Sequence, residues 1–440
     1  TPVIGFSAEY DALPGLSQRA GFSERDPLDY RDDPYAPTIG PGHGCGHNLL
    51  GVGSAGGALG LKAAMEAYDI SGSIKVFGAP AEEQLAGKAF MARAGVYAGL
   101  DACLDWHPGS HAVAGRGSSN AMYSVVFTFT GSTGHGGHPW GNKSALDAVE
   151  VLNIMTEYLR EENVSSTGRV HYAIPASTGA PNVTTDLAHA WYFIREKSPE
   201  DVELLYQKVC RIAEAAAMAT GTHLTTRFIA GCWSTLPNEA GAKIVERNIE
   251  EVPAVEWTAD EQQLVRAIQA TLGLPQRGLP EPFKAKPEWF AQSNGRPPHM
   301  GGSTDVADIS RLTPVLRMTA PTWAQGAPGH HWQIVALSGT SVGFKGMEFA
   351  SKALAATGID LLCDADLLQE VRAEFEEQAA AEPYRPLIPS HVEPPVYEPP
   401  AWFLEATGQS WPLPGLTWPR PRLFSREQPG KVSTKPIGGF

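Results

Sequence analysis

The strongest constraint on this chain is the alternation of short apolar runs with helical stretches over its first 118 residues. Val3-Ile4-Gly5-Phe6 and Ile74-Lys75-Val76-Phe77 are typical of buried strands, and the small residues from Leu49 to about Tyr68 predict a helix between them. Such alternation predicts an α/β fold, with a mostly parallel sheet and helices on its faces. In sheets of this kind, active sites lie at the carboxyl ends of the strands.

A different pattern begins near Asn120. The expected elements follow the order strand, helix, strand, strand, helix, strand, and they lie at residues 123–129, 145–160, 170–173, 190–194, 199–220 and 223–229. This is the order of a ferredoxin-like α+β unit. We therefore predict an inserted domain at residues 120–234, between a first catalytic part at 1–119 and a second at 235–382. The second part looks rich in loops from Leu274 to Gln333.

The remaining residues, 383–440, are predicted to form a proline-rich tail. Prolines crowd together from Pro383 onward, and such a composition cannot sustain the interior of a helix or a sheet. Basic and aromatic residues near its end, such as Trp418 and Arg420, suggest a docking arm as the alternative to a solvated tail. At the other end, the chain opens at Thr1 directly into a strand-like run, which indicates a processed or amino-terminally incomplete sequence.

Composition narrows the class of protein. With 440 residues, of which 42% are hydrophobic, the chain can bury a large core in more than one compact unit. Its net charge of -14 argues against a nucleic-acid partner and favours small molecules. Five widely spaced cysteines fit a reducing cytoplasm, and no apolar run has the length of a membrane span. We therefore expect a cytoplasmic protein that binds neither membranes nor nucleic acids.

Two local patterns carry metal-ligand chemistry. Cys45 and His47 stand two residues apart in a glycine-rich loop, where glycines allow a tight turn that lets both side chains converge. Glu82 and Glu83 follow the strand-like run that ends at Phe77. One such carboxylate can bind a metal while its neighbour takes a proton from water. Each pattern alone is more often ordinary packing or a solvated loop.

Two histidines extend this set. His107 follows an apolar run in Leu104-Asp105-Trp106-His107-Pro108, and His330 lies in Ala327-Pro328-Gly329-His330-His331. A single histidine is most often a surface residue or a satisfied core residue. Four ligand groups at successive strand ends are harder to explain in that way. Together they supply enough thiolate, imidazole and carboxylate ligands for two metal ions.

The ordered set of motifs resembles a known family, the amidohydrolase branch of the aminoacylase and carboxypeptidase-G superfamily of dinuclear metallohydrolases. The motifs are Glu9-Tyr10-Asp11-Ala12-Leu13-Pro14, Gly42-His43-Gly44-Cys45-Gly46-His47-Asn48, Glu82-Glu83, Trp106-His107-Pro108, Gly134-His135-Gly136-Gly137-His138-Pro139, Ser303-Thr304-Asp305 and Pro328-Gly329-His330. They extend over residues 1–385. Members of the family carry an amino-terminal segment before the first motif, and this sequence starts without it.

The resemblance implies hydrolysis of the amide bond of an N-acyl amino acid or dipeptide-like substrate. It also implies two divalent metal ions, manganese or zinc, held by Cys45, His47, Glu83, His107 and His330. Thiolate with imidazole favours zinc, whereas the family makes manganese equally plausible. Glu82 would be the catalytic base, and Asp11 would orient a ligand. His330 is preferred to His331 because it stands two residues after Pro328.

The inserted unit would be the family's lid and dimerisation domain, so the resemblance implies a homodimer. His135 would stabilise the oxyanion, while Asn182 and Arg195 would hold the carboxylate of the substrate. Two other functions stay open. Cys45 with a nearby histidine can be the nucleophile of a thiol hydrolase. Alternatively, the chain can be a binding or regulatory subunit without turnover.

Overall fold

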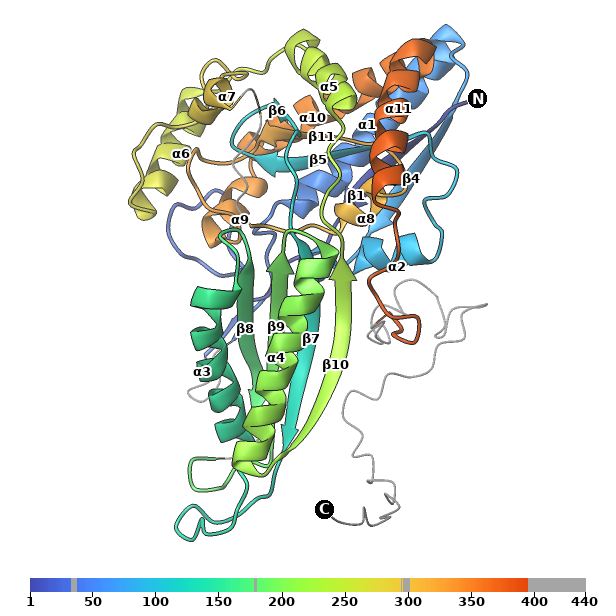
Figure 1. Ribbon diagram of the computed structural model, residues 1–440. Coiled ribbons are helices and arrows are strands. Elements are labelled where there is room, and N and C mark those ends of the chain that lie inside the picture. The colour runs from blue at the N-terminus through green and yellow to red at the C-terminus, as the bar shows by residue number, and fades with distance from the viewer. Residues whose placement is uncertain (33–37, 178–179, 294, 296–300, 395–440) are drawn as a thin grey trace, which may run out of the picture. The chain divides into compact units, whose positions relative to one another are not determined.

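The computed structural model describes residues 1–32, 38–177, 180–293, 295 and 301–394 (Figure 1). Residues Thr1–Val392 form one compact unit. The docking arm suggested near Arg420 lies outside the described residues. Among the described helices, none combines the length and the apolar character that crossing a membrane requires.

The first of two large sheets has five strands in the order β4-β1-β5-β11-β6. Its strands are β1 (Val3–Glu9), β4 (Ser73–Ala79), β5 (Ala102–Gly109), β6 (Val113–Ala114) and β11 (Val315–Pro321). All neighbours run parallel except the short β6, which is antiparallel to β11. The predicted α/β class with a mostly parallel sheet is therefore confirmed.

Strand β11 corrects one prediction of the sequence analysis. The stretch from Leu274 to Gln333 looked rich in loops, yet it supplies a strand that lies between β5 and β6. Pro314 precedes this strand and Pro321 ends it. The strand has only seven residues, and a turn-forming proline stands before it and at its end. In the sequence, such a short apolar run looks like part of a loop.

Two long helices cover one face of this sheet. α1 (His47–Tyr68) packs along α10 (Ser341–Cys363), and both contact β5. The small residues of α1 permit this packing, since a Cβ atom at Gly53 would lie 2.6 Å from the ring of Trp106. The opposite face carries α2 (Gly87–Arg93) and α8 (Val306–Ser310), whose apolar side chains pack together.

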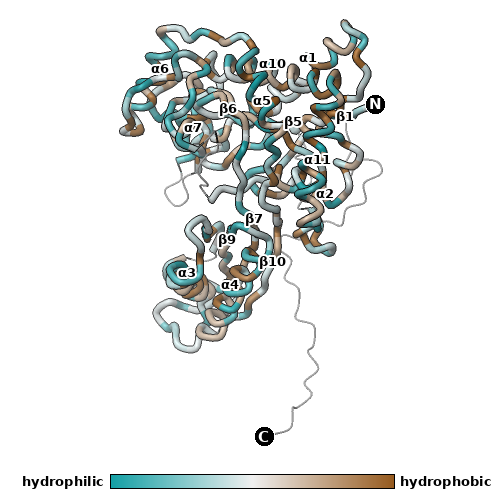
Figure 2. The backbone as a smooth tube through the Cα atoms, turned by 45° about the horizontal axis from the view of Figure 1, so that its top comes forward, coloured by the Kyte–Doolittle hydropathy of each residue, from teal (hydrophilic) through white to brown (hydrophobic). Residues whose placement is uncertain are grey.

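The second sheet has four antiparallel strands in the order β10-β7-β9-β8. They are β7 (Ala121–Thr130), β8 (Arg169–Ser177), β9 (Leu187–Glu196) and β10 (His223–Cys232). Helices α3 (Ala145–Asn163) and α4 (Pro199–Thr220) pack side by side against it (Figure 1). Along these helices the tube in Figure 2 changes between hydrophilic and hydrophobic residues, as expected when one face packs on a core. The elements thus follow the ferredoxin-like order, whereas the domain limits at 120 and 234 stay a prediction.

Shorter elements complete the first unit. They are β2 (Tyr30–Arg31), β3 (Thr38–Ile39), the 3-10 helix η1 (Glu82–Gln84), α5 (Glu239–Glu251), α6 (Ala259–Thr271), α7 (Glu288–Gln292), α9 (Trp332–Ser338) and α11 (Ala365–Ala381). Residues 383–392 form neither helix nor strand, but Leu387 and Ile388 are buried. The indole of Trp233 also donates a hydrogen bond of 2.6 Å to the carbonyl oxygen of Arg385. The first residues after α11 are therefore part of the packed unit.

Candidate metal centre

The candidate ligands meet at one edge of the parallel sheet. β1 ends at Glu9 and is followed by Asp11, β4 is followed by the Glu82-Glu83 pair, and His107 lies near the end of β5. These strands are parallel neighbours, so their carboxyl ends point to the same edge. Three segments far apart in the sequence therefore deliver side chains to one place.

A glycine-rich loop adds Cys45 and brings in His330. Gly46 has φ of 78°, a left-handed conformation that glycine adopts without strain. A Cβ atom at Gly44 would lie 2.4 Å from the side chain of Leu16 and 3.3 Å from the Cα atom of His330. The backbone N–H of His330 donates to the carbonyl oxygen of Gly44 at 2.9 Å. Only a residue without a side chain lets the His330 loop approach Cys45 this closely.

All five predicted ligands come together in two overlapping groups. Cys45, His47 and His107 form one group, and Cys45, Glu83 and His330 form the other; within each, the ligand atoms lie within 4.8 Å of one another. The Sγ atom of Cys45 is 3.3 Å from Nε2 of His107. Nε2 of His330 is 3.2 Å from Oε2 of Glu83. Cys45 is common to both groups.

The two adjacent histidines have different surroundings. His330 adopts φ of 60°, and Nε2 of its ring lies 3.2 Å from Oε2 of Glu83. His331 instead lies 3.3 Å from the side-chain oxygen of Gln333, at the start of α9. This difference favours His330 as the ligand, in agreement with the choice made from Pro328.

Asp11 lies behind the ligands and contacts two of them. Its Oδ1 is 3.0 Å from Nδ1 of His47, and its Oδ2 accepts a hydrogen bond of 2.9 Å from the backbone N–H of Glu83. Burial raises the pKa of Asp11, but these hydrogen bonds outweigh it and the pKa is lowered. A charged Asp11 can therefore fix the orientation of His47.

Burial and neighbouring carboxylates dominate the electrostatics of the site. Burial raises the pKa of Glu82, and the charge of Glu9 raises it further. For Cys45, burial and the charge of Glu83 raise the pKa of the thiol well above its usual value. Burial lowers the pKa of His47, but the hydrogen bond to Asp11 and the nearby carboxylates raise it to about 9. The site thus gathers excess negative charge in a place with little water, which favours a bound cation.

Relatives of the chain were found by sequence and by structure, although no protein-family model matches it. It is 36% identical to a subunit of the p-aminobenzoyl-glutamate hydrolase of Escherichia coli, over 89% of this chain and 84% of that protein. The chain belongs to this family, within the amidohydrolase branch of the aminoacylase and carboxypeptidase-G superfamily. It is also 27% identical to the Xaa-Arg dipeptidase of Mus musculus, over 85% of this chain and 73% of that protein.

Solved structures agree with the fold. The aminobenzoyl-glutamate utilization protein from Klebsiella pneumoniae matches with a TM-score of 0.50 and 18% identity, over 82% of this chain and 71% of that chain. At this identity the likeness concerns the architecture alone. It supports assigning both sheets to the fold of this family.

Arg195, predicted to bind substrate, lies in the four-stranded sheet near the point where the chain enters and leaves it. It is the last residue but one of β9 and pairs with Met122 of β7. Its Nε atom is buried and has no hydrogen-bond partner among the described residues. Burial lowers the pKa of its guanidinium, while the charge of Glu82 is close enough to raise it. A half-buried guanidinium with an unpartnered Nε near Glu82 is suited to bind an anionic group.

His135 and Asn182 lie together, but at the opposite end of the same sheet. The backbone N–H of Gly136 donates to the carbonyl oxygen of Asn182 at 2.7 Å, and His135 forms a β-bridge with Val183. The loops that carry His135 and Asn182 adjoin the end of β7 at Thr130 and the start of β9 at Leu187. Eight residues of β9 separate Leu187 from Arg195, roughly 25 Å along the strand, and His135 and Asn182 lie beyond the Leu187 end. One chain therefore does not bring all three substrate-binding candidates together.

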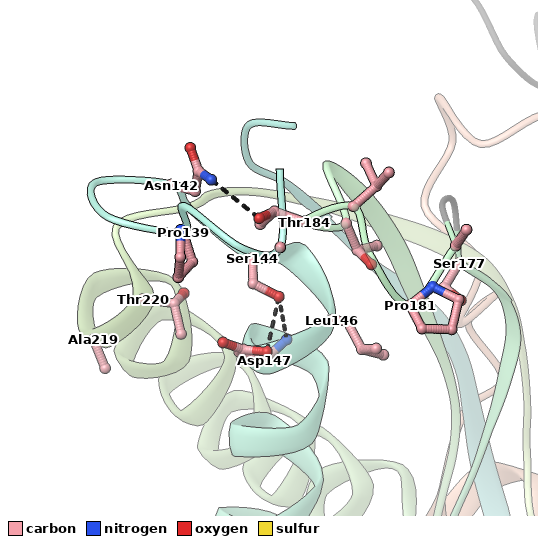
Figure 3. Close-up of a pocket in the computed structure, with 14 residues that line it drawn as sticks. Pro139, Asn142, Ser144, Leu146, Asp147, Ser177, Pro181, Thr184, Ala219 and Thr220 are labelled. Carbon is pink, nitrogen blue, oxygen red and sulfur yellow. Dashed lines mark hydrogen bonds between the residues drawn. The ribbon is translucent and has the colours of Figure 1, made fainter. Parts of the chain in front are cut away.

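The unit with the four-stranded sheet also contains a hollow of about 700 Å³ (Figure 3). Its polar lining groups already have structural partners: Asn142 donates to Thr184, and Ser144 caps α3 by accepting from the backbone N–H of Asp147. None of the metal-ligand candidates lines it. We therefore place the chemistry at the strand ends of the parallel sheet rather than in this hollow.

Sequence reasoning missed the role of three buried charges behind the site. Lys88 is fully buried, and its Nζ contacts Glu9 at 2.9 Å and also contacts Asp305. Glu9 and Asp305 belong to two of the motifs that resemble the family, but the sequence predicted no role for either residue. Lys88 follows the Glu82-Glu83 pair in a short helix, where a lysine is ordinarily solvated. Its proximity to the two acidic motifs is the signal that could have pointed to it.

Proposed function

We propose that this protein is a metal-dependent hydrolase that cleaves the amide bond of an N-acyl amino acid, a p-aminobenzoyl-glutamate-like compound or a dipeptide. Two relatives are named for cleaving p-aminobenzoyl-glutamate and Xaa-Arg dipeptides. The observation that carries the proposal is the convergence of five ligand-type side chains in two groups that share Cys45. A small-molecule substrate also fits the net charge of -14, which disfavours nucleic acids.

The side chains fit two divalent ions. Thiolate, imidazole and carboxylate are the ligand types of zinc, and carboxylate with imidazole also suits manganese. Cys45, His47 and His107 would hold one ion, and Cys45, Glu83 and His330 would hold the other. Nε2 of His47 is buried without a hydrogen-bond partner in the described part of the chain, as expected for a nitrogen that binds a cation. Bound there, the ions would polarise the scissile carbonyl group and acidify the attacking water.

Glu82 is the proposed general base. It is buried beside His47, with 3.9 Å between its Oε2 and the Nε2 of the ring, and it belongs to neither of the two ligand groups that share Cys45. Its carboxylate can take the proton of the attacking water and deliver it to the leaving amine nitrogen. The raised pKa of Glu82 suits a group that must hold a proton between these two steps.

Arg195 is the proposed anchor for the carboxylate of the substrate. Its side chain is half-buried, carries a buried and unpartnered Nε among the described residues and lies within electrostatic range of Glu82. A planar guanidinium can bind a carboxylate through two parallel hydrogen bonds. Substrates with a free carboxylate, such as acyl amino acids and dipeptides, would therefore be preferred.

His135 and Asn182 are proposed to act across a homodimer. They lie at the end of the lid sheet away from Arg195, so a lid from a second chain is the simpler source of an oxyanion donor. β8 lies at the edge of the sheet, and its only strand partner within the described residues is β9. An open edge of this kind can pair with its twin. The five free cysteines support a cytoplasmic location for such a dimer.

The rival in which Cys45 is a nucleophile receives less support. A nucleophilic cysteine needs a lowered thiol pKa, whereas burial and Glu83 raise the pKa of Cys45. The decisive experiment compares metal content with hydrolysis of N-acyl amino acids, p-aminobenzoyl-glutamate and dipeptides after loading with manganese or zinc. We expect close to two ions per chain and turnover that a chelator abolishes. Metal-free protein that still hydrolyses these amides would overturn the proposal, and metal-loaded protein without turnover would indicate a binding subunit.

A further inference from the structure

Glu9 has its two carboxylate oxygens in different environments. It is the last residue of β1 and only 2% exposed. Its Oε1 is 2.9 Å from Nζ of Lys88. Lys88 is itself fixed, because its Nζ also contacts Asp305 and its backbone N–H donates to Oδ2 of Asp305 at 2.8 Å. One carboxylate oxygen of Glu9 is therefore held in place by a buried ammonium group.

The other oxygen, Oε2, is buried and has no hydrogen-bond partner among the residues described. It lies 3.3 Å from Nε2 of His47, which also lacks a partner. Oε2 of Glu82 is 3.9 Å from the same nitrogen, and the three ligand atoms lie within 4.8 Å of one another. A protonated His47 ring forms an ion pair with Glu9 across this distance, whereas a neutral ring leaves both buried atoms unsatisfied unless a cation lies between them.

The tautomer of His47 restricts what that partner can be. Nδ1 is engaged by Asp11 at 3.0 Å, so Nε2 carries the free lone pair when the ring is neutral. One lone pair binds one ion. His47 belongs both to the group with Cys45 and His107 and to the group with Glu9 and Glu82, so an ion bound to its Nε2 lies next to Oε2 of Glu9.

We propose that Glu9 is a further metal ligand, whose Oε2 binds the same divalent ion as Nε2 of His47. This inference rests on the proposed function, because it concerns one of the two ions. Glu9 adds a carboxylate oxygen to the imidazole nitrogen of His47, and zinc accepts both donor types. Lys88 is then the positioning residue that aims Oε2 at the ion by holding Oε1.

Diffraction from the unaltered protein loaded with zinc tests this directly. Anomalous scattering at the zinc edge locates each ion, and we expect Oε2 of Glu9 at about 2.0–2.2 Å from the ion bound by His47. A separation of more than about 3 Å, or a water molecule between the two, would overturn the inference. If no ion binds at all, the proposed function fails as well, whereas two ions without Glu9 contact reject only this inference.

A variant pair gives an independent readout. Glu9→Gln keeps the size of the side chain and removes its charge, while Glu196→Gln is the matched control, a buried lid carboxylate that accepts from Ser165. With cobalt(II) as the probe, we expect Glu9→Gln to weaken one of two binding steps at least about 10-fold and to shift the visible absorption of the saturated protein. The control should match the unaltered protein. An unchanged spectrum in Glu9→Gln would reject the ligand role, and if this variant fails to fold, the diffraction experiment decides.

Discussion

Asp11 faces His47 across 3.0 Å, with its Oδ1 opposite Nδ1 of the ring. This contact fixes which ring nitrogen is free for an ion, and the partners of metal-binding histidines commonly tune affinity in this way. Asp11→Asn keeps the shape but loses the charge. We expect divalent-ion affinity to fall about 10–100-fold while the circular dichroism spectrum stays the same. Titration against a competing chelator measures the change.

The control for this variant is Asp26→Asn. Asp26 pairs with Arg19 on an exposed surface, so its loss should leave metal affinity unaltered. If Asp11→Asn binds ions as tightly as Asp26→Asn, then the contact with His47 does not orient a ligand.

Glu82 and Glu83 are adjacent in sequence but are expected to fail in different ways. Glu82→Gln should keep both ions and the fold while lowering kcat by about 10²–10⁴, because an amide cannot accept the proton. Glu83→Gln should instead lower the number of bound ions, since Glu83 belongs to the group with Cys45 and His330. Elemental analysis and steady-state kinetics on the same samples separate the two effects. Equal turnover in Glu82→Gln and the unaltered protein would refute the assignment of the base.

Arg195 allows a prediction about substrate choice. Arg195→Met retains much of the buried volume but removes the guanidinium. We expect kcat/KM to fall about 10–100-fold for a substrate with a free carboxylate, because charge-assisted hydrogen bonds are lost. The matching substrate with an amide in place of that carboxylate should react equally well with both proteins. A similar loss of kcat/KM for both substrates would mean that Arg195 stabilises the fold and does not bind the carboxylate.

The sequence was sufficient for the fold class, and it also identified side chains that the structure brings together, because both depend on local patterns. Strand ends in a parallel sheet share one edge, so short motifs after each strand predict which side chains meet. The Lys88 contacts with Glu9 and Asp305 could not be predicted in this way. The backbone N–H of Lys88 donates a hydrogen bond to Asp305, which is 217 positions away in the sequence. The burial of Lys88 also depends on the packing of α2 against α8. A lysine in a helix gives no local sign of such burial.

The separation of His135 from Arg195 could be predicted from the sequence only in part. The order of the lid elements follows from periodicity, and strand length alone sets the distance between the two ends of β9. Which end carries His135 becomes clear only from the pairing of Thr130 with Leu187. Motif similarity assigned His135 and Arg195 to one substrate, but register shows that they lie apart in one chain.

Asp308 predicts how stability depends on pH. Burial raises its pKa to about 7, outweighing hydrogen bonds from the backbone of Trp233 and the hydroxyl of Tyr384. The folded state therefore binds this proton more tightly than the unfolded state. The corresponding stability is fully present below about pH 4 and is lost as pH rises through about 7.

Asp308→Asn cannot titrate, so its free energy of unfolding should decline less between pH 4 and pH 8. Over three pKa units, the difference is at most about 4 kcal/mol. Denaturant unfolding at several pH values measures it, with Asp260→Asn as an exposed control. Identical pH profiles for Asp308→Asn and the control would show that Asp308 is not protonated in the folded protein near neutral pH.

His135 and Arg195 lie at opposite ends of the four-stranded sheet, and this separation leads to the last prediction, which concerns sharing of the site between chains. If His135 of one chain serves the ions of its partner, a His135→Ala chain and a Glu82→Gln chain are each inactive alone. A mixed dimer then contains one site that has both an intact Glu82 and an intact His135. Mixing the two variants under conditions of subunit exchange should restore activity to at most half of the sites in each mixed dimer. Exchange is verified separately with labelled chains, and absence of any recovery in exchanged samples would show that His135 acts within its own chain or takes no part in the reaction.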